Sequence, residues 1–176
     1  MLNLSVIGLA CVIDRPGYNS RYREKWGRNR WLLCKTAFCV AVERAAKFAI
    51  SEGAVLRVFP ERTSKVDDEL LRGYFDDLRI SGHPFDKKNA ADYAPLTAEQ
   101  YKTVLYDFKT KFKSSAMAQV ADMYLWPMCM GGYHRSNRAY KALVEAGKLI
   151  DCRLEGKQLA ELGVKYSCFE NVNVTP

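Results

Sequence analysis

The sequence predicts a single α/β domain in which parallel strands are flanked by helices. Two apolar runs, SVIGLACVI at residues 5–13 and AVLRVF at residues 54–59, end at turn residues, as buried strands do. Between them, residues 30–52 place apolar side chains at three- and four-residue steps and stop at Gly53, which is typical of a long helix. We expect this strand, helix and strand to form a parallel crossover unit, a βαβ unit, within a mixed sheet.

The rest of the chain adds further helices and short strands. Residues 14–31 and 80–95 are expected to be turns and loops, because Gly, Pro and polar residues gather there. A capping box begins one of the helices at Thr97, and Ser114-Ser115 begins the helix that carries Asp122. The remaining predicted elements are helices at 67–79, 97–106 and 137–146, and strands at 104–113, 148–154 and 164–169.

Composition limits the classes of protein that the chain can belong to. Hydrophobic residues make up 48% and charged residues 27%, which is typical of a globular domain rather than a disordered one. A formal net charge of +7 favours an anionic partner such as nucleic acid, although many basic proteins bind none. No apolar stretch is long enough to span a membrane, and the six cysteines lack metal or redox spacing, so we expect a cytoplasmic protein.

Three carboxylates stand where α/β proteins often hold metal ions. Asp14 and Glu61 follow the two strands that we expect to run parallel, and Asp122 interrupts the apolar run QVADMYLWPM. Mg²⁺ and Mn²⁺ prefer such oxygen ligands, and they activate water for phosphoryl transfer. Each carboxylate also has a structural alternative. Asp14 could begin a turn, Glu61 could pair with Arg57 or Arg62, and Asp122 could pair with a neighbouring lysine.

Several segments resemble one bacterial family. LACVIDRP, LLCKTAFCVAVERAAKFA, LRVFPER and KSSAMAQVADMYLWP are similar to the family called domain of unknown function 3800, which itself resembles the ribonuclease H-like superfamily. The resemblance covers roughly residues 5–170, and QVADMYLW is its most specific motif. It implies a ribonuclease H-like fold and places Asp14, Glu61 and Asp122 on the acidic positions of the family, as catalytic residues and ligands of Mg²⁺ or Mn²⁺.

The N-terminus departs from this family. Its members open with a strand bearing an aspartate, of the form D-x-S-G, whereas only three residues precede Leu4 here. The resemblance therefore implies a single domain over residues 1–176 that lacks the usual N-terminal strands and has an incomplete sheet. We expect a second copy or a partner chain to cover the exposed edge of the strand at residues 5–13. A coding sequence that begins upstream of Met1 is the other interpretation.

Basic residues gather in the segment RYREKWGRNRW, residues 21–31, with aromatic residues between them. Guanidinium and aromatic groups together suit phosphate contact and base stacking, so Arg21, Arg23 and Arg28 are candidate nucleic-acid contacts. The alternative is a solvated helix entry whose tryptophans pack on the core.

A second basic group alternates along a predicted strand. Lys109, Lys111 and Lys113 share one face of FKTKFK, so Lys113 is a further candidate contact. We prefer to interpret this stripe as protection of an edge strand. His83 and His134 are interpreted as ordinary loop histidines.

Two functions from different classes follow. The leading hypothesis is a divalent-metal-dependent nuclease that acts on nucleic acid. The alternative is a non-catalytic relative that binds nucleic acid or protein and has lost the acid of the first strand.

Overall fold

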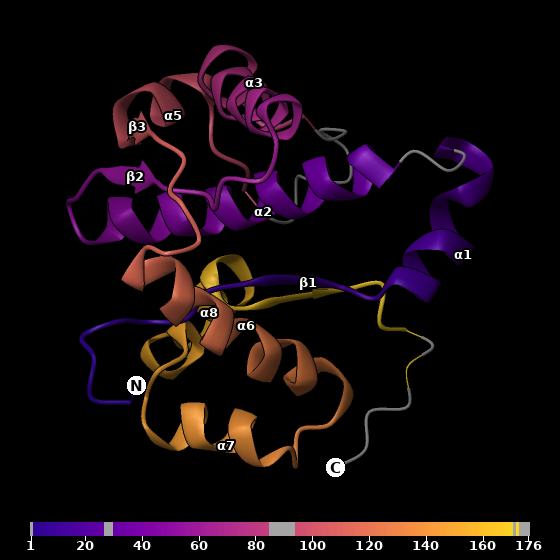
Figure 1. The fold of residues 1–176 in the computed structure, drawn as a ribbon, viewed down its shortest axis with the longest axis vertical. Helices are drawn as coiled ribbons and strands as arrows, with labels where there is room; N and C mark the ends of the chain where they lie inside the picture. Colours follow the sequence, from indigo (N-terminus) through magenta and orange to yellow (C-terminus); the bar gives the residue numbers. More distant parts are fainter. Residues whose placement is uncertain (1, 27–29, 85–93, 171, 173–176) are drawn as a thin grey trace.

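The computed structural model describes residues 2–26, 30–84, 94–170 and 172 of the chain. It is a mixed α/β structure in which helices surround two small parallel sheets (Figure 1). The helices are α1 (Arg15–Trp26), α2 (Arg30–Ser51), α3 (Lys65–Ser81), α5 (Ala98–Val104), α6 (Ala116–Tyr133), α7 (Arg138–Glu145), the 3-10 helix η2 (Ile150–Arg153) and α8 (Gly156–Leu162). The strands are β1 (Cys11–Ile13), β2 (Leu56–Val58), β3 (Leu105–Phe108) and β4 (Lys165–Ser167).

Helix α2 lies between the two sheets (Figure 1). On one side, Val42 and Ala46 pack in a core with α3, α5, β2 and β3. On the other side, Phe48 packs against the cluster around Ile150, which includes residues of α8. Because both flanks are covered, the apolar side chains of α2 form parts of two separate cores.

The pairing of the strands differs from the prediction. β1 pairs with β4, and β2 pairs with β3, in both cases parallel. The strands at 5–13 and 54–59 therefore lie in different sheets, and the predicted crossover unit between them is wrong. The parallel unit is instead β2–α3–α5–β3. An apolar run indicates a strand but carries no information about its partner, which explains the error.

The first strand is covered on both faces, as its continuous apolar run predicted. Ala10 and Val12 pack with Tyr124 of α6, whereas Ile7 and Leu9 pack on the side of α2 and η2. The ladder with β4 is short, however, and a single bridge between Gly8 and Leu149 extends it toward the N-terminus.

Residues 15–26 form helix α1 rather than the predicted turn and loop. The helix begins because Asp14 caps it: Oδ2 accepts a hydrogen bond from Gly17 N at 2.7 Å, and the carbonyl accepts one from Tyr18 N at 2.8 Å. Pro16 lies in the first turn, where its missing N–H would have no partner in the helix. The signals for a turn were therefore the signals for a helix start.

The two predictions for the C-terminal strands have opposite outcomes. Residues 164–169 do contain a strand, β4. Residues 148–154 contain η2 instead, and the predicted strand there is wrong. Asp151 explains the difference, because its Oδ1 accepts a hydrogen bond from Val164 N at 2.6 Å and ties the 3-10 turn to the start of β4. Within the described residues, no helix is long and apolar enough to cross a membrane.

Candidate functional site

Asp14 is buried at the end of β1, and both of its carboxylate oxygens have protein partners. Oδ2 accepts from Gly17 N, and Oδ1 accepts from the Tyr133 hydroxyl at 2.7 Å. Burial and the hydrogen bond to Asp14 raise the pKa of Tyr133 to about 12, so the hydroxyl remains a donor at neutral pH. These contacts make Asp14 a helix cap and a link between α1 and the end of α6.

Asp122 is exposed on α6, away from the buried face formed by Tyr124, Pro127 and Met128. Leu125, which belongs to the same apolar run of the sequence, is also exposed, at 53%. In the part of the chain that the structure describes, no ion pair of Asp122 is found. Neither the metal site nor the lysine pair that the sequence suggested is formed around it.

The three predicted carboxylates are not gathered into one centre. Tyr133, the partner of Asp14, lies 11 residues after Asp122 in the same helix, a separation of about 16 Å along the axis. Two-metal centres, in contrast, hold their ions only about 4 Å apart. Among the described residues, which include Asp14, Glu61 and Asp122, no three His, Cys, Asp or Glu side chains form a group that could hold a metal ion.

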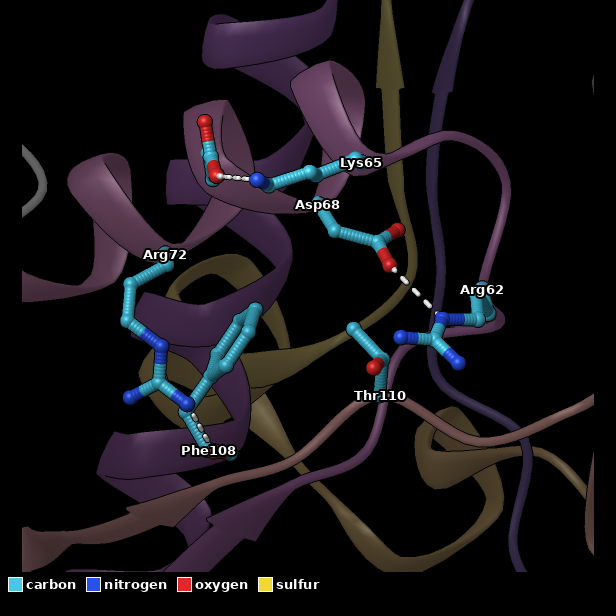
Figure 2. A pocket seen from close by; sticks show the side chains of 7 residues that line it. Arg62, Lys65, Asp68, Arg72, Phe108 and Thr110 are labelled. Atoms are coloured by element: carbon cyan, nitrogen blue, oxygen red, sulfur yellow. Dashed lines mark hydrogen bonds and ion pairs between the residues drawn. The ribbon is translucent and has the colours of Figure 1, made fainter.

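Glu61 follows β2 and forms a parallel bridge with Lys111, beyond the end of the β2–β3 ladder. The predicted pair with Arg62 is not formed, because Arg62 contacts Asp68 at 3.4 Å instead. A hollow of about 250 Å³ lies beside this end of the ladder (Figure 2). Such a place, at the carboxyl ends of parallel strands, is where α/β proteins often bind ligands.

The charged side chains that line this hollow already have partners (Figure 2). Lys65 lies 3.9 Å from Glu69, and Arg72 donates to the carbonyl of Phe108. Asp68 holds Arg62, and it also lies in the first turn of α3, where a carboxylate offsets the positive end of the helix dipole. Three cations and two carboxylates line the hollow, and each cation already has a partner, so it is not a strong anion site.

The structure describes some, but not all, of the basic residues that were predicted to contact nucleic acid. Arg21 pairs with Glu170 at 2.6 Å. Arg23 and Lys113 are exposed. Arg28 lies outside the described residues. Among the basic residues of segment 21–31 whose side chains the structure describes, Arg21 is held by an acid and Arg23 is exposed.

A group of exposed cations lies on the two segments that contain β2 and β3, residues 56–62 and 105–113, which we call the β2–β3 ribbon. Its exposed basic residues are Arg57, Arg62, Lys109, Lys111 and Lys113. The sequence singled out the three lysines, but it did not bring the two arginines to them, because that requires the parallel pairing of β2 with β3. The sequence did contain a signal for this surface, because basic and aromatic residues occur together on both segments.

A second polar cluster was missed altogether. Glu43 is buried in α2, where its carboxylate contacts His83 Nε2 at 3.0 Å and Lys47 Nζ at 3.4 Å and accepts from Leu96 N at 3.2 Å. Burial alone would raise the pKa of Glu43, but the hydrogen bond from His83 and the charges of His83 and Lys47 hold it below its usual value. His83 thus has a buried side chain that contacts Glu43, rather than being an ordinary loop histidine.

Comparison with known proteins finds a relative of the chain. The chain is similar to "Uncharacterized protein y4pM" of Sinorhizobium fredii (strain NBRC 101917 / NGR234), with 37% identity over 163 residues. The match covers 92% of this chain and 59% of that protein, so the chain spans less than two thirds of the length of its relative. No protein-family model matches the chain. No solved structure matches it. The comparisons therefore establish similarity to an uncharacterized bacterial protein.

Proposed function

We propose that the chain is a nucleic-acid-binding domain and that the β2–β3 ribbon is its binding surface. The observation that carries this proposal is the group of five exposed cations on the ribbon, together with the formal net charge of +7. Cations that neutralise phosphates supply most of the sequence-independent affinity for nucleic acid, by releasing the counterions that the phosphates hold.

Protection of an edge strand is the other interpretation of the lysines, and each strand of the two-stranded β2–β3 sheet has such an edge among the described residues. Arg57 and Arg62 stand on one segment and the three lysines on the other, so cations line both segments of the ribbon. Only the nucleic-acid proposal predicts binding that depends on salt. The acids nearby are fewer: Asp107 contacts Lys109 at 3.1 Å, Asp68 contacts Arg62 at 3.4 Å, and Glu61 is half-buried.

We also propose that the chain is related to the domain of unknown function 3800 family and has a ribonuclease H-like fold. The QVADMYLW motif and the parallel β2–β3 unit support this. A cytoplasmic location is also proposed, because all six cysteines are free thiols. Cleavage with Mg²⁺ or Mn²⁺ through Asp14, Glu61 and Asp122 is the enzymatic version of the proposal. Binding without cleavage has the stronger support, since Asp14 already caps α1 with both oxygens occupied.

Fluorescence anisotropy with labelled single strands and duplexes of DNA and RNA tests this function. We expect binding that weakens as salt rises from about 50 to 200 mM, because the contacts are to phosphates. Changing Lys109, Lys111 and Lys113 together to Gln should weaken binding and flatten the dependence on salt, by about 0.7–0.9 in slope for each phosphate contact that is lost. Asp107→Asn should strengthen binding, because it releases Lys109 from its ion pair.

The matched control is a triple change at exposed lysines outside the ribbon, Lys102, Lys141 and Lys157 to Gln, which removes the same charge. Equal loss of affinity in both triple variants would show that net charge alone binds nucleic acid and would contradict the ribbon as the site. Absence of binding to every probe would refute the function. Cleavage with Mg²⁺ or Mn²⁺ that Asp122→Asn abolishes would replace binding with the nuclease hypothesis.

A further inference from the structure

We infer that the β2–β3 ribbon binds single-stranded nucleic acid by stacking bases on its exposed aromatic rings. This inference rests on the proposed function and adds the form of the ligand. The rings are Phe59, Tyr106 and Phe112, with exposed fractions of 46%, 63% and 65%. A single exposed ring is ordinary on a protein surface, but three on one short ribbon form a group.

Each of these rings has a cation over its face. The guanidinium of Arg57 lies 4.8 Å from the centre of the Tyr106 ring, and Lys111 Nζ lies 5.1 Å from the centre of Phe59. The third pair, Arg62 over Phe112 at 5.1 Å, stands at the carboxyl end of the ribbon. Base stacking and phosphate contact can therefore occur at the same three places.

The strand register places two of the pairs on one face. Arg57 stands opposite Asp107, and Glu61 is bridged to Lys111, so alternate residues from 57 to 61 share a face with those from 107 to 111. The register shifts between Leu56 and Arg57, so Tyr106 is an extra residue of β3 with no partner opposite it in β2. This bulge places the Tyr106 ring on the same face, under the guanidinium of Arg57.

The dimensions suit a short stretch of single strand. From Arg57 to Arg62 the ribbon extends for about 17 Å at roughly 3.3 Å per residue, which fits a footprint of about four nucleotides, at the lower end of single-strand site sizes. A duplex hides the faces of its bases, so it can use the cations but not the rings. The rings therefore predict a preference for single strands.

The test compares ring variants with charge variants in anisotropy titrations. The probes are a labelled oligothymidine of about 12 nucleotides and a duplex of equal length. We expect the unmodified chain to bind the single strand more tightly than the duplex. Tyr106→Leu and Phe59→Leu should each weaken single-strand binding about tenfold, with the salt slope and duplex binding unchanged, because stacking is lost while the cations remain.

The controls separate stacking from a general loss of structure. Phe59→Tyr keeps a ring and should keep the affinity. Trp126→Leu removes another exposed aromatic ring, on α6, and should change nothing. Equal affinity for both probes, with ring variants that bind like the unmodified chain, would overturn the stacking inference and leave nucleic-acid binding intact. Failure to bind either probe would overturn both.

Discussion

At the scale of single residues, Asp14 has the most sharply defined role in the structure. We predict that Asp14→Ala lowers the free energy of unfolding by about 1–3 kcal/mol, because the change removes the cap of α1 and leaves the half-buried Tyr133 hydroxyl without its acceptor. Urea denaturation followed by circular dichroism measures this difference.

Tyr133→Phe is the matched control for Asp14, because it removes the hydroxyl and leaves the helix cap in place. It should lower the free energy of unfolding less than Asp14→Ala does. If Asp14→Ala instead leaves stability unchanged and abolishes Mn²⁺ binding in calorimetry, Asp14 is a metal ligand rather than a structural cap.

Glu43 gives a prediction about pH. Its folded pKa is held below the usual value of 4.5, so its stabilising effect is complete above about pH 4.5 and is lost as pH falls through the folded pKa. Glu43→Gln should therefore lower the free energy of unfolding by about 2 kcal/mol near neutral pH. The difference between the two proteins should shrink below pH 4.5 in urea titrations at several pH values.

An exposed glutamate provides the comparison for Glu43. Glu99 pairs with Lys102 at the surface, and its side chain is 80% exposed. Glu99→Gln should change the free energy of unfolding very little at any of these pH values. A constant difference between Glu43→Gln and the unmodified chain from pH 3 to 7 would show that Glu43 is not the group whose protonation matters.

At the scale of helices and strands, the sequence predicts which segments form elements better than it predicts how they pair. The helix predicted at 30–52 is α2, and the capping box at Thr97 is formed, with Gln100 as its reciprocal partner. Caps and apolar periods act within a few residues, so they are visible in the chain. The β2–β3 pairing joins segments far apart in sequence, and it alone brings Arg57 to Tyr106. Asp14 and Glu61 were grouped because their strands were expected to lie in one sheet. Those strands lie in different sheets, and for this reason the predicted group of carboxylates is not formed.

Two glycines within helices should respond in opposite directions to alanine. At Gly73 in α3 nothing lies within 4 Å of an added Cβ, so Gly73→Ala should raise the free energy of unfolding by about 0.5–1 kcal/mol. At Gly132 in α6 the Cβ would lie 2.6 Å from Tyr166 Cδ1 and 2.8 Å from Phe169 Cε1. Gly132→Ala should lower it by about 1–3 kcal/mol. Thermal unfolding of both variants measures the shifts, and shifts of the same sign would contradict this packing.

At the scale of the whole molecule, β1 has a free edge. The backbone groups of Ala10 and Asp14 form hydrogen bonds with β4. Because backbone groups alternate in direction along a strand, the N–H and C=O groups of Leu9, Cys11 and Ile13 point to the opposite edge. Within the described residues no strand pairs there. We predict that a second copy of the chain covers this edge, since unpaired strand edges favour association. Sedimentation should show a dimer at micromolar concentration, and a monodisperse monomer would contradict it.

Two of the buried clusters of the molecule are joined through α2, and Arg44 adds hydrogen bonds to the packing of Phe48 on the side of α8. Its guanidinium is buried and donates to the carbonyls of Gly163 and Ala160 at the end of α8, at 2.5 and 2.8 Å. Such carbonyls have no partner within their own helix and form its negative end. Arg44→Met should therefore lower the free energy of unfolding by about 2–4 kcal/mol.

The loss of stability in Arg44→Met should be greatest in the part of the molecule that Arg44 contacts. Hydrogen exchange should quicken more in α8 and β4 than in α3 and α5, because the latter pack on the other side of α2 in a separate core. Arg57→Met, which removes an exposed guanidinium, is the matched control and should leave the exchange of α8 unchanged. Uniform quickening in both parts after Arg44→Met would show instead that the two cores unfold as one unit.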